Sequence, residues 1–256
     1  MIPFVGQSRL PQGSALPCPP GLSPFDRSPR SGATGEFLRG IDTIPYFPPP
    51  SSTLQEPVAI GLSTHISTMN NAERQEQMHT LDEGISVCTR CPLHQSRTHA
   101  VPGEGPIPAD VFILGEAPGA MEDRQGRPFV GPSGRLLVPL LKVAGLSRED
   151  VYITSCVKCR PPNNRTPHAH ELDTCQANWL NRQLELVNPK IIVLLGKVAI
   201  GRILQEEGSL RTLHGQVIER DGRRCLITYH PAAAFRVPQT RTSMEEDMAV
   251  LKRLLK

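Results

Sequence analysis

Aromatic residues and long apolar runs are scarce in this chain of 256 residues. Aromatics make up 4% of it, and there is a single tryptophan. No apolar run approaches the roughly 20 residues that a membrane-spanning helix needs, which argues against a membrane protein. The N-terminus also lacks the charged and then apolar layout of a secretory signal peptide. We therefore expect a cytoplasmic protein.

Phosphate-binding motifs and a strong charge imbalance are lacking too. Neither G-x-G-x-x-G nor G-K-[S/T] occurs, which removes the usual sequence basis for a dinucleotide-binding or P-loop protein. The net charge is +3 and the isoelectric point is near 8.5. This mildly basic balance is compatible with a nucleic-acid partner but is too weak to argue for one by itself.

Proline is unevenly distributed along the chain. The first sixty residues carry 12 of the 26 prolines, together with clusters of glycine and serine, and no helical or strand period. Such a segment cannot bury enough apolar surface to offset its chain entropy. We predict a disordered N-terminal tail over residues 1–75 and a folded domain over residues 80–256.

The folded part alternates short apolar runs with helical patterns. Strands are expected at 110–115, 151–157, 190–196 and 225–229, with helices between and after them. Ser133, Thr166 and Ser243 are the expected helix starts, the last in a capping box with Glu246. Continuous apolar strands that alternate with helices indicate a parallel sheet covered on both faces. The predicted fold is a three-layer α/β/α domain with a central four-stranded parallel sheet.

Four of the seven cysteines have the spacing of a metal site. Cys88 and Cys91 form C-x-x-C, while Cys159 and Cys175 stand at the two ends of a loop-plus-helix segment. Two pairs of thiolates suit a tetrahedral metal ion or an iron–sulfur cluster, and the spacing does not separate these. His94 is an alternative fourth ligand in the zinc interpretation. Cys156 and Cys225 lie in apolar strands and are expected to be small core residues.

Two loops that follow strands carry residues suited to a ligand. The first, from Gly115 to Gly134, is rich in glycine, so a flat ligand can approach its main chain, and Phe129 within it is a candidate stacking face. The second begins at His230, directly after the last strand, where a histidine is suited to hydrogen-bond a ligand. Ligands on parallel sheets bind beyond the carboxyl ends of the strands, which is where both loops lie.

Three loop sequences together resemble a known family. GEAPGAMEDRQGRPFVGPSGRLL, YITSCVKCRPPNNRTP and YHPAAAFR, in this order and preceded by C-x-x-C, are similar to the type-4 uracil-DNA glycosylases over residues 80–256. The resemblance implies a [4Fe-4S] cluster rather than zinc. Its ligands would be Cys88, Cys91, Cys159 and Cys175.

The resemblance also implies roles for individual residues. Uracil would be flipped out of DNA and its bond to the sugar hydrolysed, leaving an abasic site. The implied uracil-binding residues are Gly115, Glu116, Ala117, Phe129, Ser155 and His230. Asn164 and His230 are the implied catalytic residues, for the water or sugar and for the uracil carbonyl respectively. The expected DNA contacts are Lys158, Arg160, Arg165, Ala234, Phe235 and Arg236.

Two positions depart from what the superfamily commonly has. Ala117 stands where its best-known branch has a water-activating aspartate, a loss that type-4 members share. Ser155 stands where an asparagine amide commonly reads the uracil edge, and a hydroxyl cannot span two base atoms as an amide does. We therefore expect weaker or broader base selection.

Two alternatives to this interpretation remain open. One alternative is a lesion-binding iron–sulfur protein without catalysis or with hypoxanthine or xanthine as substrate, and another is a zinc-stabilised nucleotide-binding protein. Otherwise we expect a monomeric, nucleoid-associated prokaryotic repair enzyme. Its substrate would be uracil in single- or double-stranded DNA.

Overall fold

The computed structural model describes residues 69–206 and 208–256. Most of the predicted N-terminal tail lies outside these residues. Its expected end is too late, because Asn71–Ser86 form the first helix, α1. Asn70 caps this helix by accepting a hydrogen bond from the main-chain N–H of Glu73, whose side chain in turn accepts from the N–H of Asn70. This capping box begins the helix where the sequence analysis still placed a tail.

Five strands form one sheet in the order β2-β1-β3-β5-β4. Four are parallel, as predicted, namely β1 (Val111–Gly115), β2 (Tyr152–Ser155), β3 (Ile191–Leu195) and β5 (Arg223–Thr228). The fifth, β4 (Val217–Arg220), pairs antiparallel with β5 at the sheet edge and was missed. Its side chains are mostly exposed, so it has no apolar run. The Asp221–Gly222 pair, with both φ angles positive, is the hairpin turn that could have revealed it.

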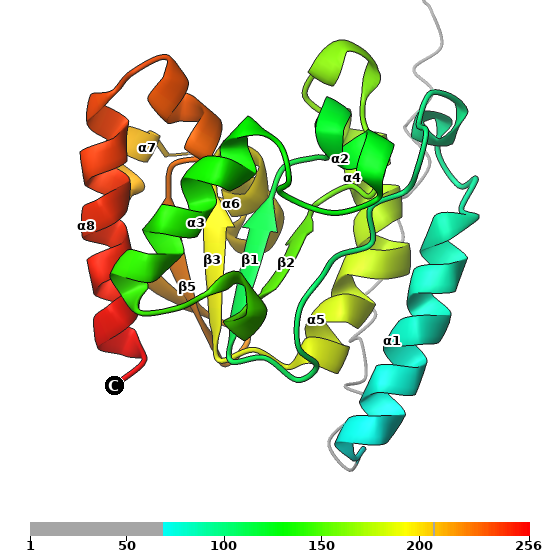
Figure 1. The fold of residues 1–256 in the computed structure, drawn as a ribbon, viewed down its shortest axis with the longest axis horizontal. Coiled ribbons are helices and arrows are strands. Elements are labelled where there is room, and N and C mark those ends of the chain that lie inside the picture. The colour runs from blue at the N-terminus through cyan, green and yellow to red at the C-terminus, as the bar shows by residue number, and fades with distance from the viewer. Residues whose placement is uncertain (1–68, 207) are drawn as a thin grey trace, which may run out of the picture. The chain divides into compact units, whose positions relative to one another are not determined.

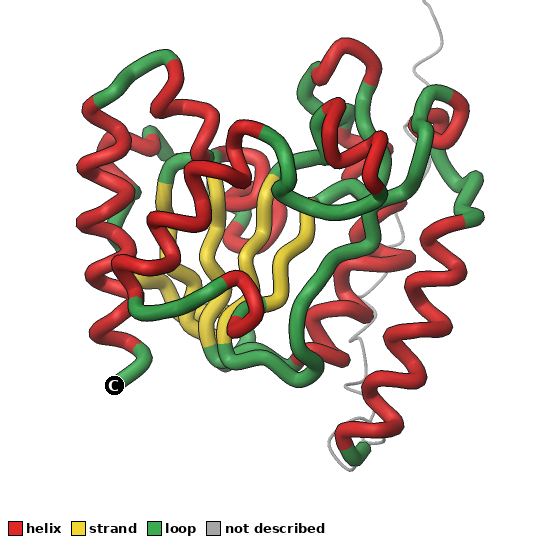
Figure 2. The backbone as a smooth tube through the Cα atoms, viewed as in Figure 1, coloured by secondary structure: helices red, strands yellow, loops and turns green. Residues whose placement is uncertain are grey.

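Helices cover both faces of the sheet (Figures 1 and 2). On one face α3 (Pro132–Ala144) and α8 (Gln239–Leu254) pack on alternate residues of the strands, among them Ile113, Ile153 and Val193. On the other face α6 (Lys197–Leu204) and a long helical segment pack on residues such as Phe112, Leu114 and Leu194, and α1 packs against that helical segment. The three-layer α/β/α fold is therefore confirmed.

The long helical segment holds one of the four predicted ligand cysteines. It consists of α4 (Ala169–Cys175), a π-helical turn (Gln176–Leu180) and α5 (Asn181–Val187). It begins after His168, whereas Thr166 was the expected start. Among the described residues, the other α-helices are short: α2 (Ala120–Gln125) and α7 (Leu210–Leu213).

Two other expected helix starts are wrong as well. The N-cap of α3 is Gly131 rather than Ser133, with Pro132 in the first turn, where its missing N–H leaves no unpaired donor. Helix α8 begins at Gln239, so Ser243 lies inside it rather than at its cap. In both cases a glycine or proline outside the apolar stripe sets the boundary. Within the described residues, no helix is both long and apolar enough to cross a membrane.

Candidate active site and cysteine pocket

The predicted ligand loops meet at the carboxyl edge of the sheet. Gly115 ends β1, Ser155 ends β2 and His230 follows β5 by two residues. Gly115 and Ser155 are paired in the register of the two neighbouring strands. Because all four parallel strands end at this edge, their loops surround one region above β1 and β3 (Figure 1).

Phe129 lies over the end of β1 and beside His230. A Cβ atom placed on Gly115 would come within 2.7 Å of the Phe129 ring, so only glycine fits beneath the ring. The rings of Phe129 and His230 have centroids 5.9 Å apart and planes inclined by 38°. Phe129 is buried, with 7% of its surface exposed. The structure thus brings together four of the predicted base-binding residues: Gly115, Phe129, Ser155 and His230.

His230 is held as a neutral hydrogen-bond donor. Its Nδ1 accepts a hydrogen bond from the main-chain N–H of Ala232, at 3.2 Å. Burial lowers its pKa to about 4, against the opposing effect of the Glu122 carboxylate. The ring is therefore uncharged at neutral pH, and its proton resides on Nε2, because Nδ1 is the acceptor.

Asn164 and the arginines around it lie on a tight turn beside this region. Asn163 and Asn164 both have φ of +54°, a conformation that asparagine tolerates. The Arg160 Nε donates to Asn164 Oδ1 at 2.7 Å, and Arg165 forms a two-pronged ion pair with Glu171. Asn164 is exposed, and within the described residues its side chain is hydrogen-bonded to Arg160.

Lys158 does not fit the predicted contact with DNA phosphates. Its side chain is 1% exposed, and Nζ donates to Thr154 Oγ1 and to the Ser155 carbonyl, both at 2.7 Å. The ammonium group therefore faces the interior, where burial lowers its pKa to about 8. The prediction was wrong because a basic residue in a polar loop was taken to be exposed.

The loop after His230 is exposed, as a DNA-contacting loop must be. Phe235 is 60% exposed and Val237 is 50% exposed, and Arg236 between them is also exposed. Ala234 is half-buried. Large exposed apolar side chains on the loop that follows His230 are suited to contact DNA where a base is unstacked.

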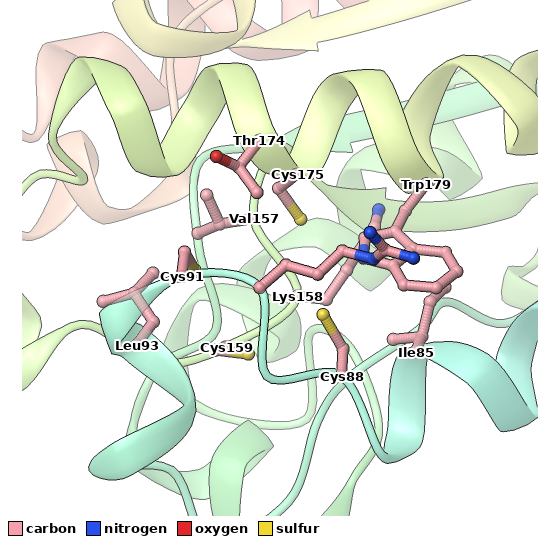
Figure 3. Close-up of a pocket in the computed structure, with 11 residues that line it drawn as sticks. Ile85, Cys88, Cys91, Leu93, Val157, Lys158, Cys159, Thr174, Cys175 and Trp179 are labelled. Atoms are coloured by element: carbon pink, nitrogen blue, oxygen red, sulfur yellow. The ribbon is translucent and has the colours of Figure 1, made fainter.

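The four predicted ligand cysteines line one pocket. Cys88, Cys91, Cys159 and Cys175 surround it together with Ile85, Leu93, Val157, Lys158 and Trp179 (Figure 3). Burial raises the pKa of Cys91, Cys159 and Cys175, and neighbouring cysteines raise each pKa further. The pocket unites the C-terminal end of α1, the loop after β2 and α4. His94 is not among its lining residues, and its Nδ1 lies 2.8 Å from the Cys91 carbonyl.

The four thiols share one pocket, which suits either a single metal ion or an iron–sulfur cluster. Four sulfurs bound to one zinc ion would each lie about 2.3 Å from it. Within the described residues, no group of three or more histidine, cysteine or acidic side chains has the geometry to hold a metal ion. The arrangement of the thiols therefore does not separate zinc from an iron–sulfur cluster.

Comparison with known proteins shows the family of this chain. The sequence profile of the uracil DNA glycosylase superfamily matches residues 102–252. The chain belongs to this superfamily. It is 42% identical over 182 residues to the type-4 uracil-DNA glycosylase of Pyrobaculum aerophilum, covering 68% of this chain and 92% of the relative. The type-4 enzyme of Thermotoga maritima is 43% identical over 165 residues, covering 64% of this chain and 85% of the relative.

The type-5 branch of the superfamily is also similar. The type-5 uracil-DNA glycosylase of Pyrobaculum aerophilum is 38% identical over 170 residues, covering 60% of this chain and 74% of the relative. Membership confirms the family recognised in the sequence. It also confirms that the chain is an enzyme of the uracil-DNA glycosylase class, hydrolases of N-glycosyl bonds.

Sequence reasoning missed the charged residues that hold the glycine-rich loop. Glu122 is buried, and its Oε1 accepts from the main-chain N–H of Gly131 at 2.7 Å, which ties the two arms of the glycine-rich loop together. Arg148 and Glu104 approach the same loop from elsewhere in the chain. An acidic residue two positions into a short helix gave a weak sign of Glu122, but nothing in the sequence pointed to the other two.

Proposed function

We propose that this chain is a type-4 uracil-DNA glycosylase with a [4Fe-4S] cluster. It hydrolyses the bond between uracil and deoxyribose in single- or double-stranded DNA, releasing uracil and leaving an abasic site. The observation that carries the proposal is the neutral His230 beside Phe129 at the carboxyl edge of the sheet. Residues 80–256 form the catalytic domain in this proposal.

The leaving group is stabilised by His230. As the bond from the sugar to N1 of the base breaks, its electron pair moves onto uracil and charge develops on the carbonyl oxygens. The Nε2–H of a neutral imidazole donates to one such oxygen, and a donor aimed at developing charge contributes a few kcal/mol. Phe129 stacks on the base, and the main chain of Gly115, Glu116 and Ala117 lines its other side.

Water completes the hydrolysis at the sugar. Its oxygen bonds to C1′ as the base departs, and its proton is lost to solvent while the uracil anion is protonated. We assign the positioning of this water to Asn164, which lies near Thr166, a partner of the Glu116 side chain. Asn164 must then exchange its bond with Arg160 for one with the substrate or water.

The DNA strand lies against residues of two loops, of which Phe235 and Arg236 are exposed and Arg160 and Arg165 are half-buried. Arg160, Arg165 and Arg236 are suited to phosphates, and Phe235 is suited to fill the gap that the flipped base leaves. Because Lys158 is buried, it has no part in this contact. The protein acts as a cytoplasmic, nucleoid-associated monomer in this proposal.

Cys88, Cys91, Cys159 and Cys175 would hold the cluster. When bound, it supplies four metal–thiolate links that join α1, the loop after β2 and α4. The Arg97 guanidinium donates to Cys159 Sγ at 3.0 Å, and Lys158 is among the residues that line the same pocket. Both cations suit the negative charge that four thiolates bring. The cluster has a structural role here, because it fixes the loop that carries Asn164.

An oligonucleotide assay tests the proposal. The purified brown protein is mixed with a labelled oligonucleotide that contains one uracil, and abasic sites are cleaved by alkali. We expect a cut at the uracil position in single and double strands. If uracil, hypoxanthine and xanthine are all left intact, the alternative of a lesion-binding protein without catalysis is correct.

Ser155 is the observation that favours a second candidate, a glycosylase of broader selection. The serine is 5% exposed and lies at the end of β2, in register with Gly115. The same assay with hypoxanthine and xanthine tests it, with Ser155→Asn as the matched variant. We expect Ser155→Asn to raise the preference for uracil, because an amide pairs with two edge atoms where a hydroxyl pairs with one. An unchanged preference would show that Ser155 does not read the base.

The low pKa of His230 predicts how base release depends on pH. Burial lowers this pKa from 6.5 to about 4, so the neutral donor persists in the folded protein down to about pH 5. The single-turnover rate should show no inflection near pH 6.5. An inflection there that His230→Gln abolishes would contradict this assignment.

The lowered pKa of His230 also makes the stability of the folded protein depend on pH. In the unfolded chain the histidine takes up its proton near pH 6.5, whereas the folded protein resists protonation until about pH 4. The unfolded state therefore binds more protons in this window. The contribution of His230 to stability is present above pH 6.5 and is lost as the pH falls toward 4.

A further inference from the structure

Phe129 has a backbone conformation that its own side chain disfavours. Its φ is +51°, in the left-handed region where bulky residues are rare. Such a conformation persists only where the surroundings impose it, and such residues cluster at functional sites. Gly134 allows it, since a Cβ atom at that position would come within 1.7 Å of the Phe129 carbonyl oxygen. The absence of a side chain at Gly134 makes room for the conformation but does not enforce it.

Arg148 supplies the contacts that enforce this conformation. It lies in a short 3₁₀ turn, Arg148–Asp150, just before β2. Its Nη1 donates to the Phe129 carbonyl at 3.1 Å, and its Nη2 donates to the Pro128 carbonyl. Two successive carbonyls are thus fixed by one planar guanidinium. A guanidinium presents its donors as a rigid fork, so it sets the direction of both peptide groups.

Glu104 anchors Arg148 to the sheet. The Arg148 Nε donates to Glu104 Oε1 at 3.0 Å. The main chain of Glu104 exchanges two hydrogen bonds with Ile153 in β2, at 2.9 and 2.7 Å. Arg127 also pairs with Glu104, and these partners lower the pKa of the Glu104 carboxyl to about 2, so it is charged at any working pH. Through Glu104, the Arg148 guanidinium is therefore anchored to strand β2 rather than to another loop.

We propose that Arg148, held by Glu104, is a positioning residue that sets the Phe129 ring over Gly115 and beside His230 for base stacking. The inference rests on the proposed function, because stacking by Phe129 is part of it. Arg148 is 15% exposed and its three hydrogen-bonded nitrogens are all engaged within the protein, so it acts through Phe129 rather than on the base.

A double-mutant cycle tests the proposal on the cluster-loaded protein. Arg148→Met should lower kcat/KM for a uracil oligonucleotide about tenfold or more, mainly through KM, because base stacking on an aromatic ring is lost. In the Phe129→Ala background the same change should have less than about a twofold effect, since there is no ring left to position. Arg127→Met is the matched control, because Arg127 pairs with Glu104 without contacting either carbonyl in these hydrogen bonds, and it should retain activity.

Amide hydrogen exchange provides a readout that does not need activity. Arg148→Met should accelerate exchange in the segment 129–131 more than Arg127→Met does. Arg148→Lys replaces the methionine variant if that one fails to fold, since lysine keeps the charge but cannot bridge both carbonyls.

The outcomes separate the two proposals. If the wild-type protein releases no base, the proposed function fails, and the exchange measurement still decides the role of Arg148. Unchanged exchange, wild-type kcat/KM in Arg148→Met, or effects of Arg148→Met and Phe129→Ala that simply add would each overturn the positioning role.

Discussion

Replacing His230 by alanine should slow base release by about 10² to 10³-fold while DNA binding changes by less than about threefold. The reason is that Nε2–H acts on charge that exists only as the bond to uracil breaks. In the ground state the same hydrogen bond goes to a neutral carbonyl and contributes little. The measurement is a single-turnover release rate, paired with binding of an oligonucleotide whose uracil analogue resists hydrolysis.

Two further variants make the His230 result specific. His230→Gln keeps an N–H donor and should recover part of the rate. Arg236→Ala, on the exposed loop that follows, should weaken DNA binding more than it slows release, because Arg236 is suited to phosphates rather than to the base. Equal losses of binding and of release in His230→Ala would count against its action at the leaving group.

Replacing Cys175 by alanine should remove most of the bound iron and lower the free energy of unfolding by several kcal/mol. Binding energy at a structural metal site is also folding energy, because the unfolded chain has no preformed site. Cys175 is the ligand that ties α4 to the loop after β2, so its loss should loosen the segment that carries Asn164. Iron per chain, visible absorption and denaturant unfolding measure the effect.

Cys225 provides the matched control for this experiment. It is fully buried in β5 and does not line the cysteine pocket. Cys225→Ala removes the same atoms as Cys175→Ala, so it should cost about 1 kcal/mol for the small cavity and leave the iron content unchanged. Comparable iron in the two variants would rule out Cys175 as a ligand. A colourless wild-type protein that contains zinc would instead support the zinc alternative.

Much of the fold could be predicted from the sequence because its determinants are local. Continuous apolar runs mark strands buried on both faces, and all four predicted runs are parallel strands. Helix starts were less readable, since Ser133 and Ser243 look like caps but lie inside helices that begin earlier. The edge strand β4 has no apolar run because its side chains are mostly exposed, so only its Asp–Gly turn marks it.

By itself the sequence determined which residues could do chemistry. Spacing along the chain made the four cysteines candidate metal ligands, and position in loops that follow strands made Phe129 and His230 candidate ligand-binding residues. Only the tertiary structure decided which way charged side chains point. Lys158 turns inward to the Ser155 carbonyl, and Arg148 reaches Phe129 across 19 residues of sequence. The physical reason is that a buried charge is tolerated only where folding brings hydrogen-bond partners to it, and here those partners come together only when the chain has folded.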